Sequence, residues 1–176
     1  EVMKLPESAA FNRVDKYGIS HPKIGVKTGK VVVKADLALG GKKKAGLVKI
    51  CDASEVEKIK KEMGVPIVVE EFIPHEKESY VAFKAAREGI ETYYSDEGGV
   101  DIEQNWDKVK KTLDQLPQFS QFYKFFQEED ATYLEINPYT DNLMPLGVVL
   151  ELDDSARYRH VDWPSEIKTM TEREKK

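Results

Sequence analysis

Most of the strand-like segments of this sequence follow one another with only a turn or a loop between them. Residues 31–33 (Val-Val-Val) are a short apolar run typical of a buried strand. Residues 45–51 form a second such segment, and Gly40-Gly41 lies between the two. Two strands joined by a glycine-bearing loop predict a hairpin. Because neighbouring strands recur along the chain, the pattern favours the α+β class over a doubly wound parallel sheet.

Helix signals occur in three places. Residues 6–17 place apolar side chains on one face and are followed by a glycine, which suits a helix stop. Ser54 and Glu57 predict a capping box for a second helix, which Gly64 should end. Residues 105–128 are rich in aromatic side chains and are predicted to be helical, with a break at a proline.

Five further segments have the length and apolar content of strands. The last two of them are expected to pair as a hairpin, and the predicted element order is α-β-β-α-β-β-β-α-α-β-β. The segments are residues 66–72, 79–87, 90–95, 132–136 and 146–152.

Composition narrows the class of protein. The 176 residues suit one domain or two small lobes, and 27 Lys and Arg against 32 Asp and Glu argue against a nucleic-acid partner. The single cysteine, Cys51, excludes an intrachain disulfide framework. No apolar run approaches the ~18–20 residues of a membrane span, and no signal-peptide pattern is present. We therefore expect a soluble, cytoplasmic globular protein with no membrane partner.

The first polar motif is a strand lysine followed by a basic glycine loop. Lys34 closes the Val-Val-Val strand, and Gly40-Gly41-Lys42-Lys43-Lys44 follows it. Glycines let backbone N–H groups approach phosphate oxygens, and ammonium groups neutralise them. A solvated basic hairpin tip explains the loop equally well. Lys34 itself needs a counter-charge or water, because it ends a buried strand.

The second motif follows the strand at residues 66–72. Glu70-Glu71-Phe72-Ile73 runs into Pro74 and suits a hinge between two lobes, and the carboxylate of Glu78 could accept hydrogen bonds from a ribose. An acidic surface loop is the alternative. His75 is isolated from any Cys/His cluster, so a surface or structural role is expected for it.

Two more motifs could face a ligand. Glu97-Gly98-Gly99 suits either a tight turn near an anionic or metal-bound ligand or an ordinary turn. Glu135 and Asn137 are two residues apart on a predicted strand, so both side chains share a face. Paired hard oxygen donors suit Mg²⁺, which keeps waters and bridges substrate phosphates. A polar strand edge is the alternative reading of this pair.

The joint order of these motifs resembles the ATP-grasp domain of the nucleoside-diphosphate-forming acyl-CoA synthetases. This family holds succinate–CoA ligase β subunits and ATP-citrate lyase. The hairpin VVVKADLALGGKKKAGLVK follows the family pattern of a strand lysine and a glycine-basic loop. Three segments look closest to ATP-citrate lyase: EEFIPHEKESYVAFKAAREG, EGGVDIEQNWDKVKK and LDDSARYRHVDW.

The resemblance covers about residues 11–163 and implies one ATP-grasp domain over residues 1–176. Its fold would be α+β, with two α/β lobes whose mainly antiparallel or mixed sheets enclose a nucleotide cleft. The smaller lobe would span roughly residues 24–72, the larger lobe roughly 1–23 with 73–163, and residues 164–176 would be a tail.

The resemblance also implies a role for each motif. Mg²⁺ would lie at Glu135 and Asn137, and the phosphoryl-transfer centre would face Glu97, Gly98 and Gly99. ATP would be held by Lys34, Gly40, Gly41, Lys42, Lys43, Glu70, Glu71, Phe72, Ile73 and Glu78.

Gly147 stands where the family has a metal-binding aspartate, so the Mg²⁺ site would be weakened or completed by another group. The chain is also short for such a domain. In relatives the phosphohistidine, the CoA site and the citrate pocket lie on other domains. Citrate cleavage would therefore need a hetero-oligomeric partner with CoA-ligase and citrate-synthase-like domains. A succinate–CoA ligase β subunit and a non-catalytic nucleotide-binding or assembly subunit are the alternatives.

Overall fold

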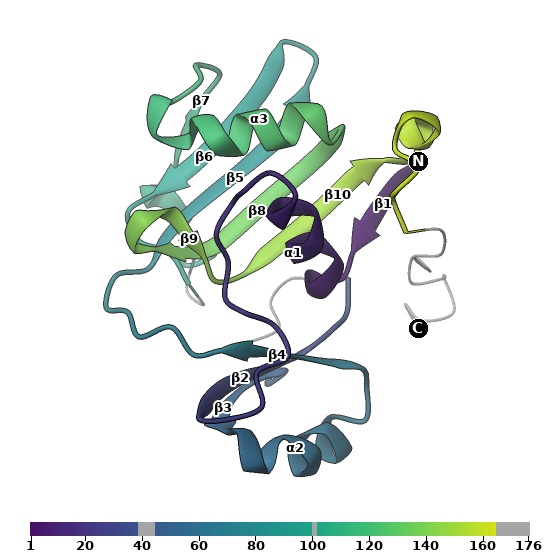
Figure 1. Cartoon of the computed structure of the whole chain (residues 1–176). Coiled ribbons are helices and arrows are strands. Elements are labelled where there is room, and N and C mark those ends of the chain that lie inside the picture. The colour runs from purple at the N-terminus through teal and green to yellow at the C-terminus, as the bar shows by residue number, and fades with distance from the viewer. Residues whose placement is uncertain (39–44, 100–101, 165–176) are drawn as a thin grey trace.

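The fold consists of two antiparallel sheets and three α-helices, described for residues 1–38, 45–99 and 102–164 of a computed structural model (Figure 1). The large sheet has the strand order β1-β10-β8-β5-β6-β7, with β9 paired to β8, and the small sheet has the order β3-β2-β4. The helices are α1 (Glu7–Asp15), α2 (Val56–Met63) and α3 (Ser120–Glu128). The small sheet contains β2 (Lys30–Ala35), β3 (Val48–Asp52) and β4 (Ile67–Glu71). The large sheet contains β1 (Val2–Leu5), β5 (Ser79–Ala86), β6 (Gly89–Ser95), β7 (Lys110–Thr112), β8 (Ala131–Thr140), β9 (Met144–Pro145) and β10 (Val148–Asp153).

One face of the large sheet is covered by α1 and α3, which build the main core with it (Figure 1). Side chains alternate along a strand, so Val81 and Phe83 of β5 and Leu134 and Ile136 of β8 all reach this core. Phe83 lies within an aromatic cluster contributed by α3 and the turn before it. Burial of each such side chain stabilises the fold by about 1.5–3 kcal/mol, so this face anchors the larger part of the molecule.

Side chains also alternate between the two faces of the small sheet. Val31, Val33 and Ala35 of β2 are fully buried, whereas Val32 and Lys34 point to the opposite face, toward the large sheet. α2 lies beneath the small sheet in Figure 1, and its apolar residues are only half-buried. The small sheet therefore has a thin core of its own and presents its other face to the rest of the chain.

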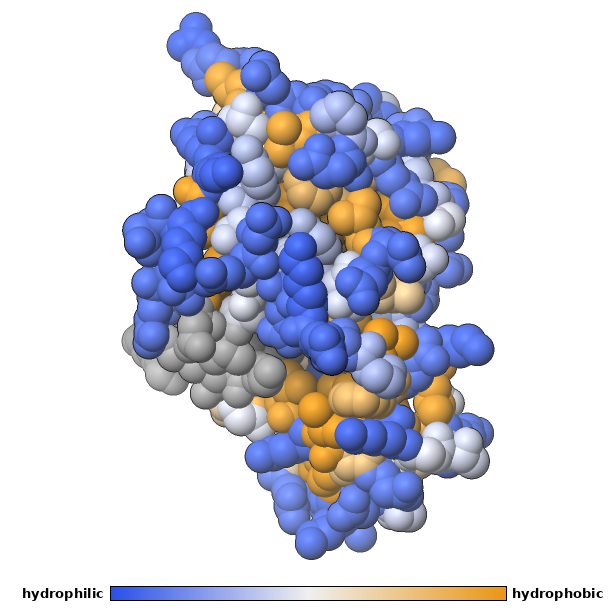
Figure 2. Space-filling view, turned by 90° about the vertical axis from the view of Figure 1, so that its left-hand side faces the viewer, coloured by the Kyte–Doolittle hydropathy of each residue, from blue (hydrophilic) through white to orange (hydrophobic). Residues whose placement is uncertain are grey.

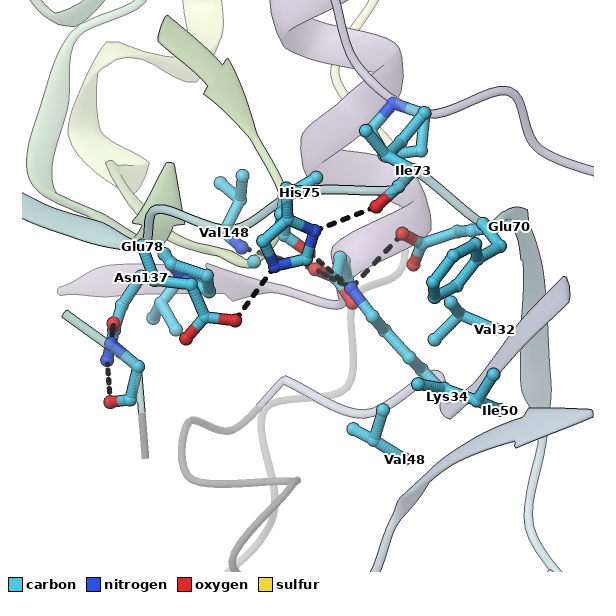
Figure 3. Close-up of a pocket in the computed structure, with 18 of the residues that line it drawn as sticks. Val32, Lys34, Val48, Ile50, Glu70, Ile73, His75, Glu78, Asn137 and Val148 are labelled. Atoms are coloured by element: carbon cyan, nitrogen blue, oxygen red, sulfur yellow. Dashed lines mark hydrogen bonds and ion pairs between the residues drawn. The ribbon is translucent and has the colours of Figure 1, made fainter. Parts of the chain in front are cut away.

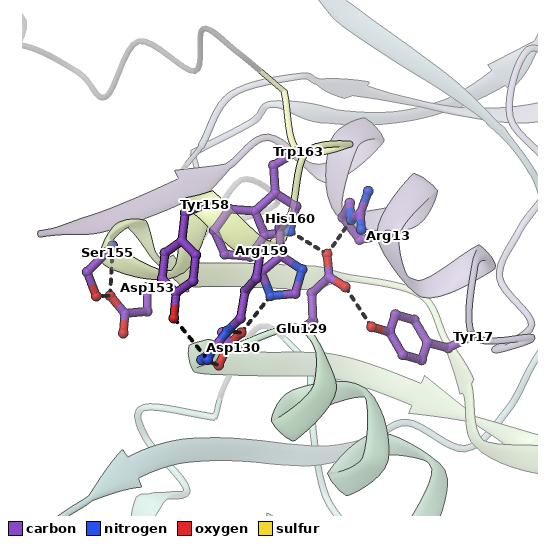
Figure 4. Close-up of polar contacts among 10 residues, drawn as sticks. All are labelled: Arg13, Tyr17, Glu129, Asp130, Asp153, Ser155, Tyr158, Arg159, His160 and Trp163. Carbon is purple, nitrogen blue, oxygen red and sulfur yellow. Dashed lines mark hydrogen bonds and ion pairs between the residues drawn. The ribbon is translucent and has the colours of Figure 1, made fainter.

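The segment after β10 is fixed to both helices of the main core by a buried polar cluster (Figure 4). The carboxylate of Glu129 is fully buried and accepts hydrogen bonds from Arg13, from the hydroxyl of Tyr17 at 2.8 Å and from the indole nitrogen of Trp163 at 2.7 Å. Asp162 adds ion pairs to Arg13 and Lys16. These contacts join the end of α3, the face of α1 and the segment that follows β10.

The structure confirms the antiparallel α+β architecture. β2 pairs with β3 as the predicted hairpin, and β8 pairs antiparallel with β10. The N-terminal strand β1 was missed, although its alternation leaves Met3 and Leu5 buried against the core and pairs them with β10.

Two local predictions were wrong. Residues 105–128 are not one broken helix, because Trp106–Lys108 form a single 3₁₀ turn and Lys110–Thr112 pair with β6 as an edge strand. Those three residues carry no apolar stripe, so pairing with a sheet satisfies their backbone better than a helix would. The capping box before α2 uses Asp52 and Glu55 rather than Ser54 and Glu57.

None of the helices in the described ranges has the length and apolar character needed to span a membrane.

Candidate functional site

A cleft lies between the small sheet and the adjoining end of the large sheet (Figure 3). In the space-filling view, apolar surface is visible in both the upper and the lower part of the molecule (Figure 2). The cleft combines apolar side chains of the small sheet with charged side chains from both sheets. Its lining includes Glu7, Val32, Lys34, Val48, Ile50, Glu70, Glu71, Phe72, Ile73, His75, Glu78, Gly99, Glu103, Glu135, Asn137, Gly147 and Val149.

The small sheet supplies an apolar wall. Val32 pairs in register with Ile50 of β3, so the two side chains lie side by side on the cleft face. Phe72 follows β4 on the same lining, and the ammonium group of Lys30 lies 4.0 Å from the centre of its ring. Ile50 is 56% exposed, which is unusual for a large apolar side chain on a sheet. Such a wall could take up a planar, weakly polar group of a ligand.

Lys34 is enclosed by acceptors from three elements. Its Nζ lies 3.1 Å from Glu7 Oε1, 3.1 Å from Glu70 Oε1 and 2.5 Å from the carbonyl oxygen of Leu146. Burial alone would lower the pKa of Lys34, but the charges of the two carboxylates together hold it above its usual value. Lys34 is thus a permanently charged group whose three N–H donors each have an acceptor within the chain.

A second contact joins the end of β2 to helix α1. Asp36, just after β2, accepts a hydrogen bond from the backbone N–H of Ser8 at 3.1 Å and one from its hydroxyl at 2.5 Å. Glu7 also accepts from the backbone N–H of Val148 at 3.2 Å. The first turn of α1 is therefore bonded to the small sheet through Asp36 and Lys34, and to the large sheet through Val148.

The predicted hinge, residues 70–73 at the end of β4, makes hydrogen bonds with other segments of the chain. The backbone N–H of Glu71 donates to the carbonyl of Lys23 at 2.8 Å, and the backbone N–H of Lys23 donates to Glu71 Oε1 at 2.9 Å. The carbonyl oxygen of Ile73 lies 2.7 Å from His75 Nδ1. The hinge residues line the cleft, with part of their polar groups engaged in these contacts.

Glu78 directly precedes β5 of the large sheet and lies next to the turn at Gly98 and Gly99. Its carbonyl oxygen accepts from the backbone N–H of Gly98 at 2.9 Å, and its Oε1 lies 2.9 Å from His75 Nε2. A Cβ at Gly98 would come within 3.0 Å of the backbone of Ser79, and one at Gly99 would collide with the Glu78 carboxylate. Glycine is therefore required at position 98 by the close approach of the β5 backbone, and it is favoured at position 99 by a φ of +95°.

The amide of Asn137 is clamped to the same turn. Asn137 Oδ1 accepts from the backbone N–H of Gly99 at 2.6 Å, and Nδ2 donates to the carbonyl of Gly99 at 3.1 Å. Glu135, on the same strand, accepts from the hydroxyl of Tyr133 at 2.6 Å. Burial raises the pKa of Glu135, the Tyr133 hydroxyl partly offsets this, and the charge of Glu103 adds to the rise.

The residues of this corner do not fit a Mg²⁺ ion held as the resemblance implies. Gly147 offers no carboxylate, and a Cβ there would lie within 3.0 Å of the carbonyl oxygen of Asn137. Both polar groups of the Asn137 amide are hydrogen-bonded to the backbone of Gly99. Of the two residues expected to bind the metal, only Glu135 therefore has a side chain that is not held by this turn. In residues 1–38, 45–99 and 102–164, no group of three His, Cys, Asp or Glu side chains is arranged to hold a metal ion.

The remaining site predictions fall in two groups. Gly98 supports the turn without lining the cleft, and the largely exposed Glu97 pairs with Lys108 at 2.7 Å. Gly40, Gly41, Lys42 and Lys43 lie outside the described residues.

Several lining residues were not singled out from the sequence. Glu7 lies within the helix predicted over residues 6–17, and Val32 is the middle residue of the predicted Val-Val-Val strand. Period-two alternation with Lys34 was the signal that could have placed Val32 on the cleft face. Glu7, His75 and Glu103 reach the cleft through tertiary contacts for which the sequence carries no local signal.

No protein-family model matches the sequence. Among curated proteins, the chain is 31% identical over 175 residues to ATP-citrate synthase alpha chain protein 2 of Oryza sativa subsp. japonica, covering 76% of this chain and 41% of that protein. It is 32% identical over 216 residues to the succinate–CoA ligase [ADP-forming] subunit beta of Methanocaldococcus jannaschii, covering 90% of this chain and 59% of that protein. The chain thus spans about half the length of these relatives. The second alignment exceeds the 176 residues of this chain, so that relative carries insertions.

Among solved structures, ATP citrate lyase from Methanothrix soehngenii in complex with citrate and coenzyme A aligns with a TM-score of 0.66. The alignment has 24% sequence identity and covers 97% of this chain and 48% of that chain. The similarity extends over both sheets and confirms the ATP-grasp fold.

Proposed function

The chain is an ATP-grasp homologue of ATP-citrate synthase alpha chains and succinate–CoA ligase beta subunits, and on this basis we propose that it is the nucleotide-binding subunit, or a fragment of it, of an ATP-citrate lyase. The observation that carries the proposal is the cleft, which brings the strand lysine, the hinge and the two large-sheet motifs to one cavity. Nine residues expected at the nucleotide, the phosphoryl-transfer centre or the metal line this cavity: Lys34, Glu70, Glu71, Phe72, Ile73, Glu78, Gly99, Glu135 and Asn137.

In this proposal the base of ATP stacks against the apolar wall of Val32 and Ile50, beside the hinge. The carboxylate of Glu78 accepts hydrogen bonds from the ribose. Lys34 lies at the closed end of the cleft and faces the phosphates, which must share it with Glu7 and Glu70. Gly40, Gly41, Lys42 and Lys43 would add N–H donors and positive charge to the phosphates.

Nucleotide binding can be tested by calorimetry on the chain alone. We expect ATP to bind with a Kd below about 1 mM. Ile50→Glu should weaken binding at least tenfold, because Ile50 is exposed on the cleft wall and its replacement puts a carboxylate against the base. Val161→Glu, at a 94% exposed site outside the cleft lining, is the matched control. An unmodified chain that binds no ATP at millimolar concentration contradicts the proposal.

The full reaction would need a partner. We propose that a subunit with CoA-ligase and citrate-synthase-like domains joins this chain in a hetero-oligomer that converts citrate and CoA to acetyl-CoA and oxaloacetate. The alternative acyl substrate is succinate, since succinate–CoA ligase beta subunits are also homologues. ATP-dependent consumption of CoA by the reconstituted complex distinguishes the two, because each hypothesis predicts activity with one acid alone.

A second candidate is a nucleotide-binding or assembly subunit without catalytic activity. Gly147 favours it, because the backbone at this position leaves no room for the expected metal-binding side chain. Calorimetry with and without Mg²⁺ separates the candidates. Binding of ATP that is equal in Mg²⁺ and in EDTA supports the non-catalytic subunit, whereas binding that is lost in EDTA supports the catalytic one.

A further inference from the structure

His75 lies between two acceptors on the segment that joins the small sheet to the large sheet (Figure 3). Its Nδ1 is 2.7 Å from the carbonyl oxygen of Ile73, and its Nε2 is 2.9 Å from Glu78 Oε1. A carbonyl oxygen can only accept, so Nδ1 must carry a hydrogen. A neutral imidazole then presents a lone pair at Nε2, which a carboxylate oxygen would repel. The contact with Glu78 therefore requires one further proton.

We propose that His75 is a positioning residue for Glu78, and that it holds this carboxylate toward the nucleotide ribose only while the imidazole is protonated on both nitrogens. The inference rests on the proposed function, because Glu78 is the residue proposed to bind the ribose. It adds that the affinity of the cleft for a nucleotide depends on pH through His75.

The position of Glu78 makes it sensitive to this contact. Its Oε2 lies so close to Gly99 that a Cβ there would collide with it, and its carbonyl oxygen is bonded to Gly98. One carboxylate oxygen is thus confined by the glycine turn and the other is held by His75. Within the described part of the chain, His75 is the group that contacts Oε1, so loss of this contact releases that oxygen.

The contact with the carboxylate of Glu78 favours the protonated ring. Among the residues that the structure describes, the charged groups other than Glu78 that line the cleft come from α1, β2, β4, β8 and the turn before β7, and most of them are carboxylates. The side chains of His75 and Glu78 are 20% and 30% exposed, so solvent screens their interaction only in part. Carboxylates in such a partly buried setting stabilise an imidazolium. The groups are Glu7, Lys34, Glu70, Glu71, Glu103 and Glu135.

The direction in which nucleotide affinity changes with pH follows from the protonation of His75. At low pH the imidazolium is present, Glu78 is oriented and the nucleotide binds more tightly. As pH rises through the titration of His75, the proton is lost and binding weakens. A charge-assisted hydrogen bond of this kind corresponds to a change of about three- to tenfold in Kd.

The test compares ATP with 2′,3′-dideoxy-ATP by calorimetry at several pH values between 6 and 9. The two probes share their phosphates, so titration of the triphosphate affects both equally. For the unmodified chain, the Kd of ATP should rise about three- to tenfold with pH relative to that of the dideoxy probe. His75→Gln, which keeps an N–H donor but does not titrate, should make the ratio of the two Kd values independent of pH.

His21→Gln is the matched control. The ring of His21 also lies between a carbonyl and a carboxylate, but these belong to Pro22 and Asp15 and not to Glu78. This variant should keep the pH-dependent ratio of the unmodified chain.

Two outcomes overturn the inference alone: an unmodified chain that binds ATP with no pH-dependent ratio, or a His75→Gln variant that retains that ratio. A chain that binds neither nucleotide at any pH overturns the proposed function as well. A second measurement needs no variant. Ring ¹⁵N shifts of His75 at pH 6 should show both nitrogens protonated, and a neutral tautomer at that pH contradicts the inference.

Discussion

Gly147 is the residue at which this chain differs most clearly from the family it resembles. The backbone of β8 approaches it so closely that the carbonyl oxygen of Asn137 occupies the space of a Cβ. The backbone N–H of Asn137 in turn donates a hydrogen bond to the carbonyl oxygen of Gly147 at 2.9 Å. A carboxylate cannot be restored here by substitution alone, because the strand would have to move first.

A pair of glycine substitutions tests this close approach. Gly147→Asn should lower the free energy of unfolding by about 1–3 kcal/mol or more, because the new Cβ forces the backbone apart. Gly18→Asn should cost less than about 1 kcal/mol, because Gly18 has a φ of +71° that asparagine tolerates and open space around its Cα. Urea unfolding of both variants gives the comparison. Equal losses would mean that Gly147 is not sterically restricted.

At the scale of elements, each helix is positioned by polar groups at its ends as well as by its apolar face. Asp52 caps the turn that leads into α2, and Gly64 ends that helix in the left-handed conformation. The end of α3 and the face of α1 are joined through Glu129 to the segment after β10. These groups fix the two ends of the segment that contains α2 and join α1 and α3 to the chain after β10.

The cap of α2 can be tested with neighbouring residues. Asp52→Ala should lower the free energy of unfolding by about 1 kcal/mol, because Asp52 Oδ1 accepts from the backbone N–H of Ser54 at 3.0 Å. Ser54→Ala should lower it by less than Asp52→Ala does, since this variant loses only the contact of the Ser54 hydroxyl with Asp52 and keeps the backbone N–H that donates to Asp52. A larger loss for Ser54→Ala would restore the capping box expected from the sequence. Thermal or urea unfolding measures both.

The contact of Asp162 with α1 makes stability depend on pH. The hydrogen bond from Lys16, aided by Arg13, lowers the pKa of Asp162 to about 2. A carboxyl group with a lower pKa in the folded state stabilises the fold above its unfolded value of 3.8 and loses this effect as pH falls toward 2. Asp162→Asn should therefore destabilise the chain at pH 6 and have little effect near pH 2. Urea midpoints at the two pH values check this, with the exposed Asp107→Asn as a control that should show no such difference.

The strands were largely predictable from the sequence, and the contacts between elements were not. Alternating apolar residues and glycine turns carry the signal for β2 to β6, and those patterns depend only on neighbouring residues. The wrongly assigned segment at residues 105–128 contains β7, whose pairing with β6 depends on a partner distant in sequence. The same limit applies to the cleft: Lys34 was singled out from its strand, but its enclosure by Glu7 requires the fold.

At the scale of the whole molecule, the two sheets differ in how much core supports them. The large sheet carries two helices and an aromatic cluster, whereas α2 has no fully buried residue. Contacts across the cleft, between Lys34 and Glu7 and between Asp36 and Ser8, therefore contribute to holding the small sheet in place.

This difference predicts an order of amide hydrogen exchange. The central strands β5 and β8 should exchange most slowly, because they lie between paired strands and under the main core. The edge strand β3 and helix α2 should exchange first. Hydrogen exchange followed by mass spectrometry on peptides from each element makes the comparison within one sample. Equal protection of β3 and β8 would show that the chain opens as one cooperative unit.

The chain enters and leaves the small sheet at adjacent points, since Ile24 forms an isolated antiparallel bridge with Glu70. A segment whose two ends lie side by side can be exchanged without altering the path of the remaining chain. Recombination with a homologue is therefore feasible at just two junctions, before Ile24 and after Glu70. Such a chimaera would carry Val32 and Ile50 of the apolar wall from one protein into the other. Its nucleotide preference would show which sheet determines the choice between nucleotide bases.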